Sequence, residues 1–424
     1  MRNKIEGVNS LEKSWLSIIL LYIFFIFTNS LSALETKSPI KYLIVICQEN
    51  RSFDSYFGTY PFAPGFKPLP GTSFVNGIPA GSYNSDKKGN PIYAYRFTKN
   101  QTITADPEHG YETMIEAYNK GKMDKFYLVS ARKNPEKGMA AMGHYDAETI
   151  PEYWNYAQNY SLADNWFQPV FGSSTPGALY LVAAQSGTKK DPIVGGQRPA
   201  YGPYGADKRT NLADPLTYPN IGDLLTEKKI SWKWYQGGFR DGAHATHKYV
   251  AHHNPFQYFE NYRTGKYKAN LCDYDQFKKD LDTGKLPHVV FIKAEEGENE
   301  HPGSAPAETA FSVKTIEALK KSKYWKDCLV ILTFDESGGF WDHVPPPQIA
   351  KENLAPDGLQ GCGPRIPALL ISPYAKRNYV SHVQYDNTSI LKFIEWNYGI
   401  RNLNARDKNA ANLLDMLKFQ TVKK

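Results

Sequence analysis

The chain has 424 residues, of which 41% are hydrophobic and 22% charged, a composition typical of a globular protein with ample material for a core. The net charge of +7 is spread along the sequence without a block of Lys and Arg, which argues against nucleic-acid binding, and no stretch indicates a stable protein partner. The 29 Tyr, 22 Phe and 8 Trp are many. An aromatic-lined pocket or an interfacial surface would explain them, and so would core packing alone.

Residues 1–33 have the pattern of an export signal. Three basic residues precede the apolar run 15–27 (WLSIILLYIFFIF), and the small, polar NSLSA follows it. The run has 13 residues, fewer than the ~20 that span a bilayer. We predict cleavage after Ser32 or Ala33 and an exported protein, periplasmic or secreted, with one domain over 34–424. The alternative is an uncleaved anchor, because Leu31 and Leu34 extend the apolar character.

The four cysteines allow three disulfide pairings, and the sequence does not choose among them. Cys47 and Cys328 lie in apolar runs, where a buried thiol is the commoner explanation. Cys272 and Cys362 complete the set, and no two cysteines have C-x-x-C spacing, which disfavours a thiolate metal site.

The first predicted strand is the apolar run 41–47 (KYLIVIC), and Glu49 and Asn50 follow it. Their carboxylate and amide oxygens are hard ligands for a metal ion, although Glu-Asn at the end of a strand is also an ordinary turn signal. Residues 59–105 are rich in Gly, Pro, Asn, Ser and Tyr with weak periodicity, and they predict a long excursion of loops.

His109 lies at the next predicted junction, between a loop and a helix over 113–127 (TMIEAYNKGKMDKFY). It is either a surface histidine or a site residue. A second helix is predicted from Thr149, placed as its N-cap, with Pro151 in the first turn.

A third helix follows the turn FGSSTPG, with Pro176 in its first turn and Gly187 at its end. Ser174 is therefore expected at the amino end of this helix. Free N–H groups and the positive end of the helix dipole favour an anion such as a phosphate there. The alternative is that Ser174 or Thr175 merely caps the helix.

Residues 188–217 again have the composition of a loop, followed by a predicted helix over 220–227 and a strand over 230–235. Four histidines then fall within ten residues. Such a group indicates contact with a metal or a phosphate, but the spacings fit no single helix face. The four histidines are His244, His247, His252 and His253.

A further strand over 289–293 (VVFIK) leads to an acidic stretch that ends at His301.

The stretch 332–347 (LTFDESGGFWDHVPPP) follows a predicted helix over 314–319 and an apolar strand over 328–333. Its adjacent acids, Asp335 and Glu336, repel each other unless a cation lies between them. A glycine pair, Gly338 and Gly339, then lets the backbone turn sharply and a ligand approach. A charged β-turn is the alternative, but the stretch repeats the plan of a buried strand followed by metal-type ligands.

A last strand over 367–371 and a last helix over 389–396 complete an alternation of strands and helices, which predicts an α/β fold with a largely parallel sheet. In such sheets the functional sites lie at the carboxyl ends of the strands. A metal on the carboxylates would lower the pKa of a serine hydroxyl and neutralise a transferring phosphoryl group, and histidines could hold its oxygens and protonate the leaving oxygen. The candidate site comprises Glu49, Asn50, Ser174, Asp335 and Glu336, with His109, His253 and His301.

Several sequence blocks resemble the bacterial phosphoesterase family, which contains phosphatidylcholine-hydrolysing phospholipases C and a set of acid phosphatases. The resemblance implies a phosphoesterase domain over 34–424 with a fold similar to that of alkaline phosphatase and the sulfatases. That fold is an α/β/α sandwich with a largely parallel central sheet, here with long loop excursions, and a metal at the strand ends. The blocks are QENRSFDSYFG, ADNWFQ with FGSSTP, NIGDLL with ISWKWY, ENEHPG, TFDESGGFWDHVPPP and GPRIPALLISPY.

The resemblance also assigns roles to residues. It implies Ser174 as nucleophile and metal ligand, and it gives His343 a structural role. Many phospholipase members carry Pro-Thr at the positions of Ser173 and Ser174, and Asn-Arg at those of Gly177 and Ala178, so the substrate branch stays open. The implied metal ligands are Glu49, Asn50, Asp335 and Glu336, and the implied phosphate-contacting histidines are His109, His253 and His301.

The ligands supply mostly oxygen, which by itself favours Mg²⁺, Ca²⁺ or Mn²⁺, whereas the resemblance to the phospholipase branch implies zinc, which we predict. We predict a phospholipase C that hydrolyses phosphatidylcholine or related glycerophospholipids at a membrane surface, giving diacylglycerol and a phosphorylated head group. An exported acid phosphatase acting on monoesters is the alternative.

Two other classes fit parts of the pattern. A metal-free serine lipase is suggested by 172–176 (GSSTP), which resembles the nucleophile elbow G-x-S-x-G, but Pro176 replaces the last glycine. A secreted metal- or glycan-binding module is the second. Binding alone does not need a serine at a helix amino end beside four metal-type ligands.

Overall fold

The computed structural model describes residues 34–101, 103–190, 197–199, 215–241, 244–265, 268–303, 310–356 and 361–419. The predicted export signal and most of the predicted loop over 188–217 lie outside the described residues. Among the helices of these ranges, none combines the length and the apolar character that a membrane span requires.

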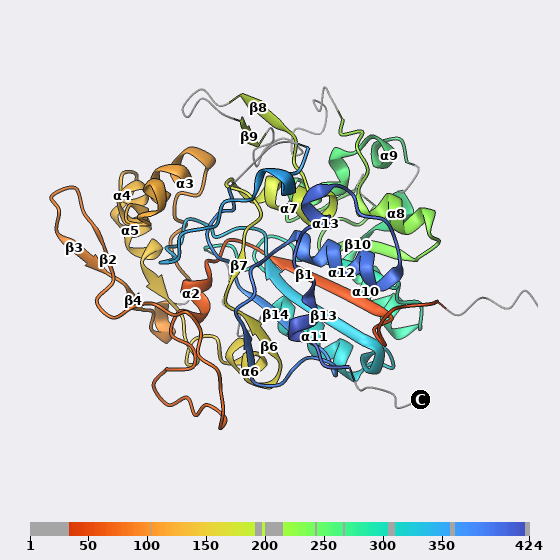
Figure 1. The fold of residues 1–424 in the computed structure, drawn as a ribbon, viewed down its shortest axis with the longest axis horizontal. Helices are drawn as coiled ribbons and strands as arrows, with labels where there is room; N and C mark the ends of the chain where they lie inside the picture. Colours follow the sequence, from red (N-terminus) through yellow and green to blue (C-terminus); the bar gives the residue numbers. More distant parts are fainter. Residues whose placement is uncertain are drawn as a thin grey trace, which may run out of the picture.

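An eight-stranded sheet forms the centre of the molecule, in the order β11-β10-β12-β1-β13-β14-β6-β15 (Figure 1). Every pairing in it is parallel except the two that β14 makes. The predicted largely parallel sheet is therefore confirmed. Its strands are β11 (Leu271–Asp273), β10 (Trp232–Gln236), β12 (Val289–Lys293), β1 (Tyr42–Gln48), β13 (Cys328–Phe334), β14 (Ala368–Ile371), β6 (Ser161–Ala163) and β15 (Tyr379–Ser381).

Helices cover both faces of this sheet. Successive residues of a strand point to opposite faces, and on β10 the ring of Tyr235 packs against Phe277 of α10, while Trp234 packs against Phe256 of the short helix η4. Because η4 contacts α7, the helices α10 and α7 lie on opposite faces, which confirms the α/β/α sandwich. The bounds are α7 (Ser174–Ala183), α10 (Tyr274–Asp282), η4 (Pro255–Tyr258), and, beside α7, α8 (Ile221–Glu227) and α12 (Thr388–Tyr398).

The three central strands are apolar because they are covered on both faces. Every residue of β12 and β13 is buried, and in β1 only Tyr42 is partly exposed. Continuous apolar runs, rather than alternating ones, are typical of parallel strands in this position. Cys47 and Cys328 lie in these strands as buried free thiols, and Cys272 and Cys362 are also unpaired.

The predicted helix over 113–127 is wrong in its middle. The chain there forms two helices, α3 (Tyr111–Tyr118) and α4 (Phe126–Ala131). Asn119 and Lys120 both have positive φ, +43° and +57°, and this left-handed backbone ends α3.

Two other helix ends differ from the sequence prediction. In α6 (Pro151–Asn159) the N-cap position belongs to Ile150, and the hydroxyl of Thr149 instead accepts the backbone N–H of Asp146. The helix α7 ends at Ala183, before the glycine expected to end it, because Ala184 has left-handed backbone and already closes the last turn.

The remaining α-helices and β-strands of the described residues are α2 (Phe53–Phe57), α5 (Pro135–Ala141), α9 (Glu260–Arg263), α11 (Phe311–Lys321), α13 (Ala405–Lys408), β2 (Tyr83–Ser85), β3 (Pro91–Tyr93), β4 (Tyr95–Arg96), β5 (Gly143–His144), β7 (Trp166–Phe167), β8 (Thr188–Lys190), β9 (Gln197–Pro199) and β16 (Tyr385–Asp386).

The predicted loop excursion over 59–105 joins α2 to α3 and contains only short elements. The strands β2 and β3 form an antiparallel hairpin, which projects at the left edge of Figure 1, and β4 pairs with β5. The excursion therefore adds surface beside the sandwich and leaves the sheet unchanged.

The Gly338 turn generates the first prediction. Gly338 has φ +65°, and a Cβ there would lie 2.5 Å from the carbonyl oxygen of Asn50. Gly399 has a similar φ of +62° with open space around it, so Gly399→Ala carries only the left-handed strain, about 1–2 kcal/mol. We expect Gly338→Ala to lower the free energy of unfolding clearly more than Gly399→Ala, as measured by urea denaturation. Equal losses of unfolding free energy in the two variants would contradict close packing of the Gly338 turn against the Asn50 turn.

Candidate functional site

The register of the central strands brings the two predicted metal-type turns together. The last residues of β1 and β13 are paired, so the residues that follow them leave the sheet side by side. The backbone N–H of Asn50 donates to Oδ1 of Asp335 over 3.2 Å. Glu49, Asn50, Asp335 and Glu336, which we call the strand-end cluster, are all 1% exposed or less.

The backbone at this cluster is strained. Asn50 has φ +59°, in a region that residues other than glycine rarely adopt. The guanidinium of Arg51 donates to the carbonyl oxygen of Asn50 over 3.0 Å and lies 4.8 Å from the centre of the Phe340 ring. Such strain persists only where the surroundings enforce it, and it is typical of functional sites.

Ser174 meets the strand-end cluster from the first turn of α7. Its hydroxyl lies 3.1 Å from Oε2 of Glu49 and 3.5 Å from Oδ1 of Asn50. The N-cap position belongs to Ser173, whose side chain makes no capping hydrogen bond, so the alternative of a simple cap at Ser174 is wrong. The oxygen partners of Ser174 also differ from the imidazole that activates the serine of a lipase.

The three predicted histidines surround the same place. His253, in η3 (Ala251–His253), has Nε2 at 3.2 Å from Oε2 of Glu49. Nε2 of His109 lies 3.3 Å from Nδ2 of Asn50, and the ring centres of His109 and His301 are 5.8 Å apart. Burial, with His252 and Lys293 nearby, holds the pKa of His253 well below its ordinary value, so this imidazole is neutral.

The histidine group seen in the sequence is divided in the structure. His252 packs edge-on against His253, with ring centres 4.4 Å apart, and lines the same cavity. His244 and His247 are exposed, and His244 pairs with Asp241. Only two of these four histidines therefore belong to the site.

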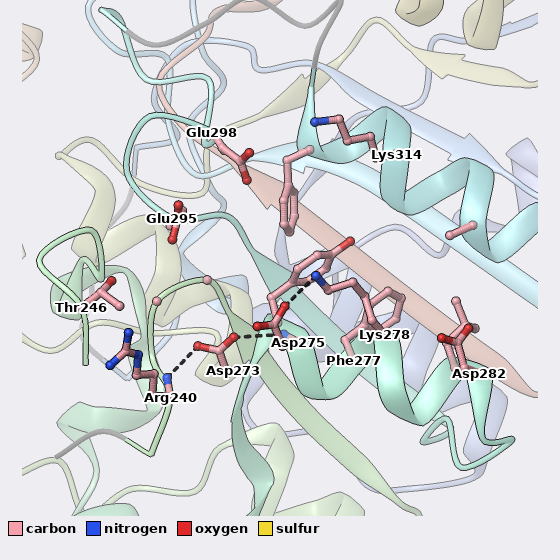
Figure 2. Close-up of a pocket in the computed structure, with 16 residues that line it drawn as sticks. Arg240, Thr246, Asp273, Asp275, Phe277, Lys278, Asp282, Glu295, Glu298 and Lys314 are labelled. Atoms are coloured by element: carbon pink, nitrogen blue, oxygen red, sulfur yellow. Dashed lines mark hydrogen bonds and ion pairs between the residues drawn. The ribbon is translucent and has the colours of Figure 1, made fainter. Parts of the chain in front are cut away.

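Five of the eight predicted site residues, Glu49, Ser174 and the three histidines, line one cavity of about 490 Å³, whereas Asn50, Asp335 and Glu336 are not among its lining residues. Its inner wall carries Glu49 and Ser174 with the histidines, and its rim carries Lys133 and Lys137, which both pair with Glu108 at 2.9 Å. Figure 2 shows a larger cavity, of about 690 Å³, at the carboxyl ends of β10 and β11. It contains none of the predicted site residues, so volume alone does not identify the site.

Lys293 belongs to the site, although the sequence did not reveal it. It is the last residue of β12 and is 1% exposed. Its ammonium contacts a carboxylate oxygen of Glu49 and lies 3.4 Å from Oδ2 of Asp335. The only signal in the sequence was a lysine at the end of an apolar strand. One buried cation therefore lies among the carboxylates of the cluster.

Burial and mutual repulsion control the charge of the cluster. Burial alone would raise the pKa of Glu49, but Lys293 and a hydrogen bond with Asp335 hold it below its ordinary value. Burial and the charge of Glu49 raise the pKa of Asp335 to about 6. Burial and the charge of Asp335 raise the pKa of Glu336 well above its ordinary value. One ammonium thus does not compensate three buried carboxylates.

The donor set fits a divalent cation. Carboxylate, amide and hydroxyl oxygens converge, and Oε1 of Glu336 is buried without a hydrogen-bond partner. A cation bound here would relieve the repulsion that raises the pKa values of Asp335 and Glu336. Asp106, His109 and His301 form a second group whose ligand atoms lie within 4.8 Å of one another.

A buried carboxylate anchors the turn that carries His301. Glu300 has φ +65° and is 1% exposed. It accepts hydrogen bonds from the Tyr56 hydroxyl at 2.8 Å, the Gln48 amide at 3.0 Å and the Ser312 hydroxyl at 3.1 Å. The position of His301 is thus tied to the end of β1 and to α2.

His343 holds the other side of the site. Its Nδ1 lies 2.7 Å from Oδ2 of Asp54, and Arg365 pairs with both Asp54 and Asp342, at 2.8 and 2.9 Å. This network joins the WDH segment to α2, just after Asn50. It agrees with the structural role expected for His343, and the guanidinium already balances the two carboxylates.

Comparison with known sequences gives a consistent result. The sequence profile of the Phosphoesterase family matches residues 40–401. A hemolytic phospholipase C of Pseudomonas aeruginosa is 28% identical over 404 residues, which cover 86% of this chain and 53% of that protein. A non-hemolytic phospholipase C of Burkholderia pseudomallei is 27% identical over 416 residues, covering 86% and 56%. The chain thus spans about half the length of these curated relatives.

Similar solved structures share little sequence with this chain. A protein of the alkaline phosphatase superfamily from Vibrio parahaemolyticus aligns with a TM-score of 0.37 and 11% identity, covering 77% of this chain and 68% of that one. A phosphonate monoester hydrolase from Silicibacter pomeroyi aligns with a TM-score of 0.38 and 11% identity, covering 65% and 73%.

The buried lysine generates the second prediction. Lys293→Met leaves Glu49 and Asp335 without their cation, so we expect a loss of about 3–5 kcal/mol of stability in the presence of a chelator. Added zinc should restore part of it, because a metal replaces the missing positive charge. Thermal unfolding with and without zinc measures both effects.

The matched control is Lys233→Met. Lys233 lies on the neighbouring strand β10 and pairs with Asp280 of α10 at 2.7 Å, and neither residue lines the 490 Å³ cavity. A Lys293 variant that unfolds like this control, with no larger response to zinc, would contradict the compensating role of the ammonium.

Proposed function

The chain belongs to the Phosphoesterase family, and from that premise we propose that it is a metal-dependent phosphoric ester hydrolase with Ser174 as its nucleophile. The observation that carries the proposal is the Ser174 hydroxyl, 3.1 Å from Glu49 within a buried cluster of oxygen ligands at the amino end of α7. That helix end favours an anion, so a phosphate group bound there would have its phosphorus next to the serine.

The residues that would hold the metal are Glu49, Asn50, Ser174, Asp335 and Glu336. A divalent ion there supplies Lewis acidity, which lowers the pKa of a serine hydroxyl and offsets the charge of the transferring phosphoryl group. Zinc is the proposed ion because of the resemblance to the phospholipase branch, and the oxygen donors keep Mg²⁺, Ca²⁺ and Mn²⁺ as alternatives.

The reaction would proceed in two displacements. Oγ of Ser174 would bond to the phosphorus as its hydroxyl proton passes to Glu49, whose carboxylate lies 3.1 Å away and would return the proton in the second displacement, and the bond from phosphorus to the diacylglycerol oxygen would break. His109 or His301 at the mouth gives that oxygen a proton, while the neutral His253 beside Glu49 hydrogen-bonds a phosphoryl oxygen. Water then attacks the phosphoserine, releases the phosphorylated head group and leaves the serine hydroxyl free for the next cycle.

Phospholipase C activity on phosphatidylcholine or related glycerophospholipids is the proposed specificity. Relatives named phospholipase C support it over most of this chain. Exported acid phosphatase activity is the second candidate, and the rim favours it, because Lys133, Lys137 and Glu108 surround the cavity with charge instead of apolar side chains. Export by the segment 1–33 remains part of the proposal for either substrate.

Product analysis distinguishes these functions. We expect phosphocholine in the ³¹P NMR spectrum of the protein incubated with phosphatidylcholine micelles, loss of this product with a chelator, and its return with zinc. Free phosphate from p-nitrophenyl phosphate, with no lipid product, would support the acid phosphatase. Turnover that survives chelation would support a serine lipase. Stoichiometric metal binding without turnover of either substrate would support a binding module.

Substitution of the nucleophile gives a further prediction. Ser174→Ala should lower kcat by about 10³-fold or more, because it removes the hydroxyl that forms the phosphorylated intermediate. Metal content, measured by elemental analysis, should fall less than activity, since four other ligands remain. Ser173→Ala is the matched control, as its hydroxyl neighbours the site without capping the helix. An inactive Ser173 variant beside an active Ser174 variant would transfer the role to Ser173.

A further inference from the structure

Exposed apolar side chains gather in one segment of the molecule. Among the described residues, eight large hydrophobic side chains are exposed, and five of them lie in the excursion between α2 and α3. Scattered single residues of this kind are normal on a protein surface, whereas a concentration in one projecting segment indicates a contact surface. The five residues are Phe62, Phe74, Tyr83, Tyr93 and Ile103.

The two phenylalanines form an exposed apolar pair. Phe62 and Phe74 are 66% and 61% exposed, yet their rings stack on each other, with centres 5.3 Å apart and planes at 15°. The loop between them is fastened to the sandwich, because the backbone N–H of Leu69 donates to Gln158 over 3.0 Å. Because the stacked rings of Phe62 and Phe74 are still mostly exposed, their outer faces can contact another apolar surface.

The hairpin of β2 and β3 has an aromatic outer face, while Ile92 on its inner face packs against a hydrophobic cluster that includes Phe126 and Trp341. Tyr83 and Tyr93 face each other across the strands and are 53% and 55% exposed. The polar Asn84 instead points inward, is 1% exposed, and accepts the backbone N–H of Tyr127 in α4 over 3.2 Å. A hairpin that covers a core normally has its aromatic side chains inside. The two tyrosine rings are here exposed to solvent on the outer face of the hairpin, where they contact each other.

The hairpin lies next to the wall of the catalytic cavity. Its strand β2 contacts α4, and α4 packs against α5. The rim lysines come from the end of α4 and from α5, as Lys133 and Lys137. In Figure 1 the hairpin, α4 and α5 form one continuous group at the left of the molecule.

Positive charge accompanies these aromatic side chains. The excursion over 59–105 contains five basic residues and one acidic residue, a net charge of +4 out of +7 for the whole chain. Arg96 is paired with Asp146, but the four lysines are exposed, and two of them form the hairpin turn. Aromatic side chains interspersed with lysines are typical of surfaces that enter the headgroup region of a membrane. The four lysines are Lys67, Lys87, Lys88 and Lys99.

We propose that Phe62, Phe74, Tyr83 and Tyr93, together with these lysines, form a docking edge that binds an anionic lipid bilayer. The rings enter the interface between headgroups and acyl chains, and the lysines pair with anionic headgroups. The phospholipid specificity proposed above gives this edge its use, so the inference deepens that function. Docking itself is a property of the surface and needs neither Ser174 nor a metal. The edge consists of two projections rather than a groove, which suits a deformable lipid surface better than a folded partner.

The test is cosedimentation of the Ser174→Ala protein with vesicles of phosphatidylcholine and phosphatidylglycerol, so that no lipid is consumed. Adding Phe62→Ser and Phe74→Ser should weaken vesicle binding about 10- to 100-fold, because two rings no longer leave water. Tyr83→Ser with Tyr93→Ser should weaken it to a smaller extent, and salt should weaken the binding of every variant. The matched control is Val383→Ser with Leu414→Ser, which removes two apolar side chains that are 38% exposed outside the excursion.

The outcomes separate docking from catalysis. In the active protein, the phenylalanine substitutions should reduce hydrolysis of vesicle lipid and leave hydrolysis of a soluble choline phosphodiester unchanged. Vesicle binding lost in the phenylalanine variant, with no lipid hydrolysis by the active protein, would support docking and overturn the phospholipase function. Phenylalanine and control variants that bind vesicles equally would overturn the docking edge. A dimer in size-exclusion chromatography that only the phenylalanine variant loses, without vesicle binding by any variant, would also overturn it in favour of self-association.

Discussion

The candidate site depends on one constraint, the repulsion among the buried carboxylates at the ends of β1 and β13. Two parallel strands, β1 and β13, end in register, and the carboxylates that follow them, Glu49, Asp335 and Glu336, are buried side by side. Buried charges of one sign are costly unless cations or hydrogen bonds compensate them. Lys293 supplies one positive charge from the end of β12. The remaining imbalance raises the pKa values of Asp335 and Glu336, and a cation bound beside them would relieve it.

The surrounding structure keeps this arrangement in place. Asn50 has left-handed backbone, and Arg51 and the Gly338 turn hold it from two sides. Glu300, also left-handed, accepts hydrogen bonds from four side chains, those of Gln48, Tyr56, Tyr153 and Ser312, and so positions His301. The left-handed backbone of Asn50 and Glu300 is strained, and the packing of the buried sheet around it holds it in place. Rigid positioning of this kind is what a phosphoryl-transfer site needs, since the chemistry depends on placement and charge more than on bond strain.

The molecule has two surfaces of opposite character near one another. The candidate-site cavity is lined by histidines, carboxylates and lysines, and its histidines and lysines suit a phosphate group. The excursion beside it exposes aromatic rings among lysines, which suit a lipid interface. A phospholipase C needs both, because its substrate carries a phosphate in water and acyl chains in a bilayer. A phosphatase for soluble monoesters would need only the first.

The sequence by itself determined the central strands and the acids at their ends. A strand covered on both faces must be apolar throughout. The strands KYLIVIC, VVFIK and CLVILT could therefore be identified without knowing which strands lie beside them. Parallel strands also collect their carboxyl ends at one edge, which is why Glu49 and Asp335 could be expected together. Local patterns also made Ser174 and the three histidines candidates, and the resemblance of the sequence blocks to a family implied their roles.

Only the tertiary structure decided which other groups join the site. A lysine at the end of an apolar strand is ordinary in sequence, and Lys293 becomes a counter-charge only because β12 is the neighbour of β1. Glu300 likewise becomes a buried anchor only because Tyr56 and Ser312 fold over it. The break between α3 and α4 depends on left-handed backbone at Asn119 and Lys120, which residue type does not dictate. The local sequence pattern indicates how deeply a segment is buried. The electrostatic partners of a side chain depend on tertiary contacts between residues that lie far apart in the chain.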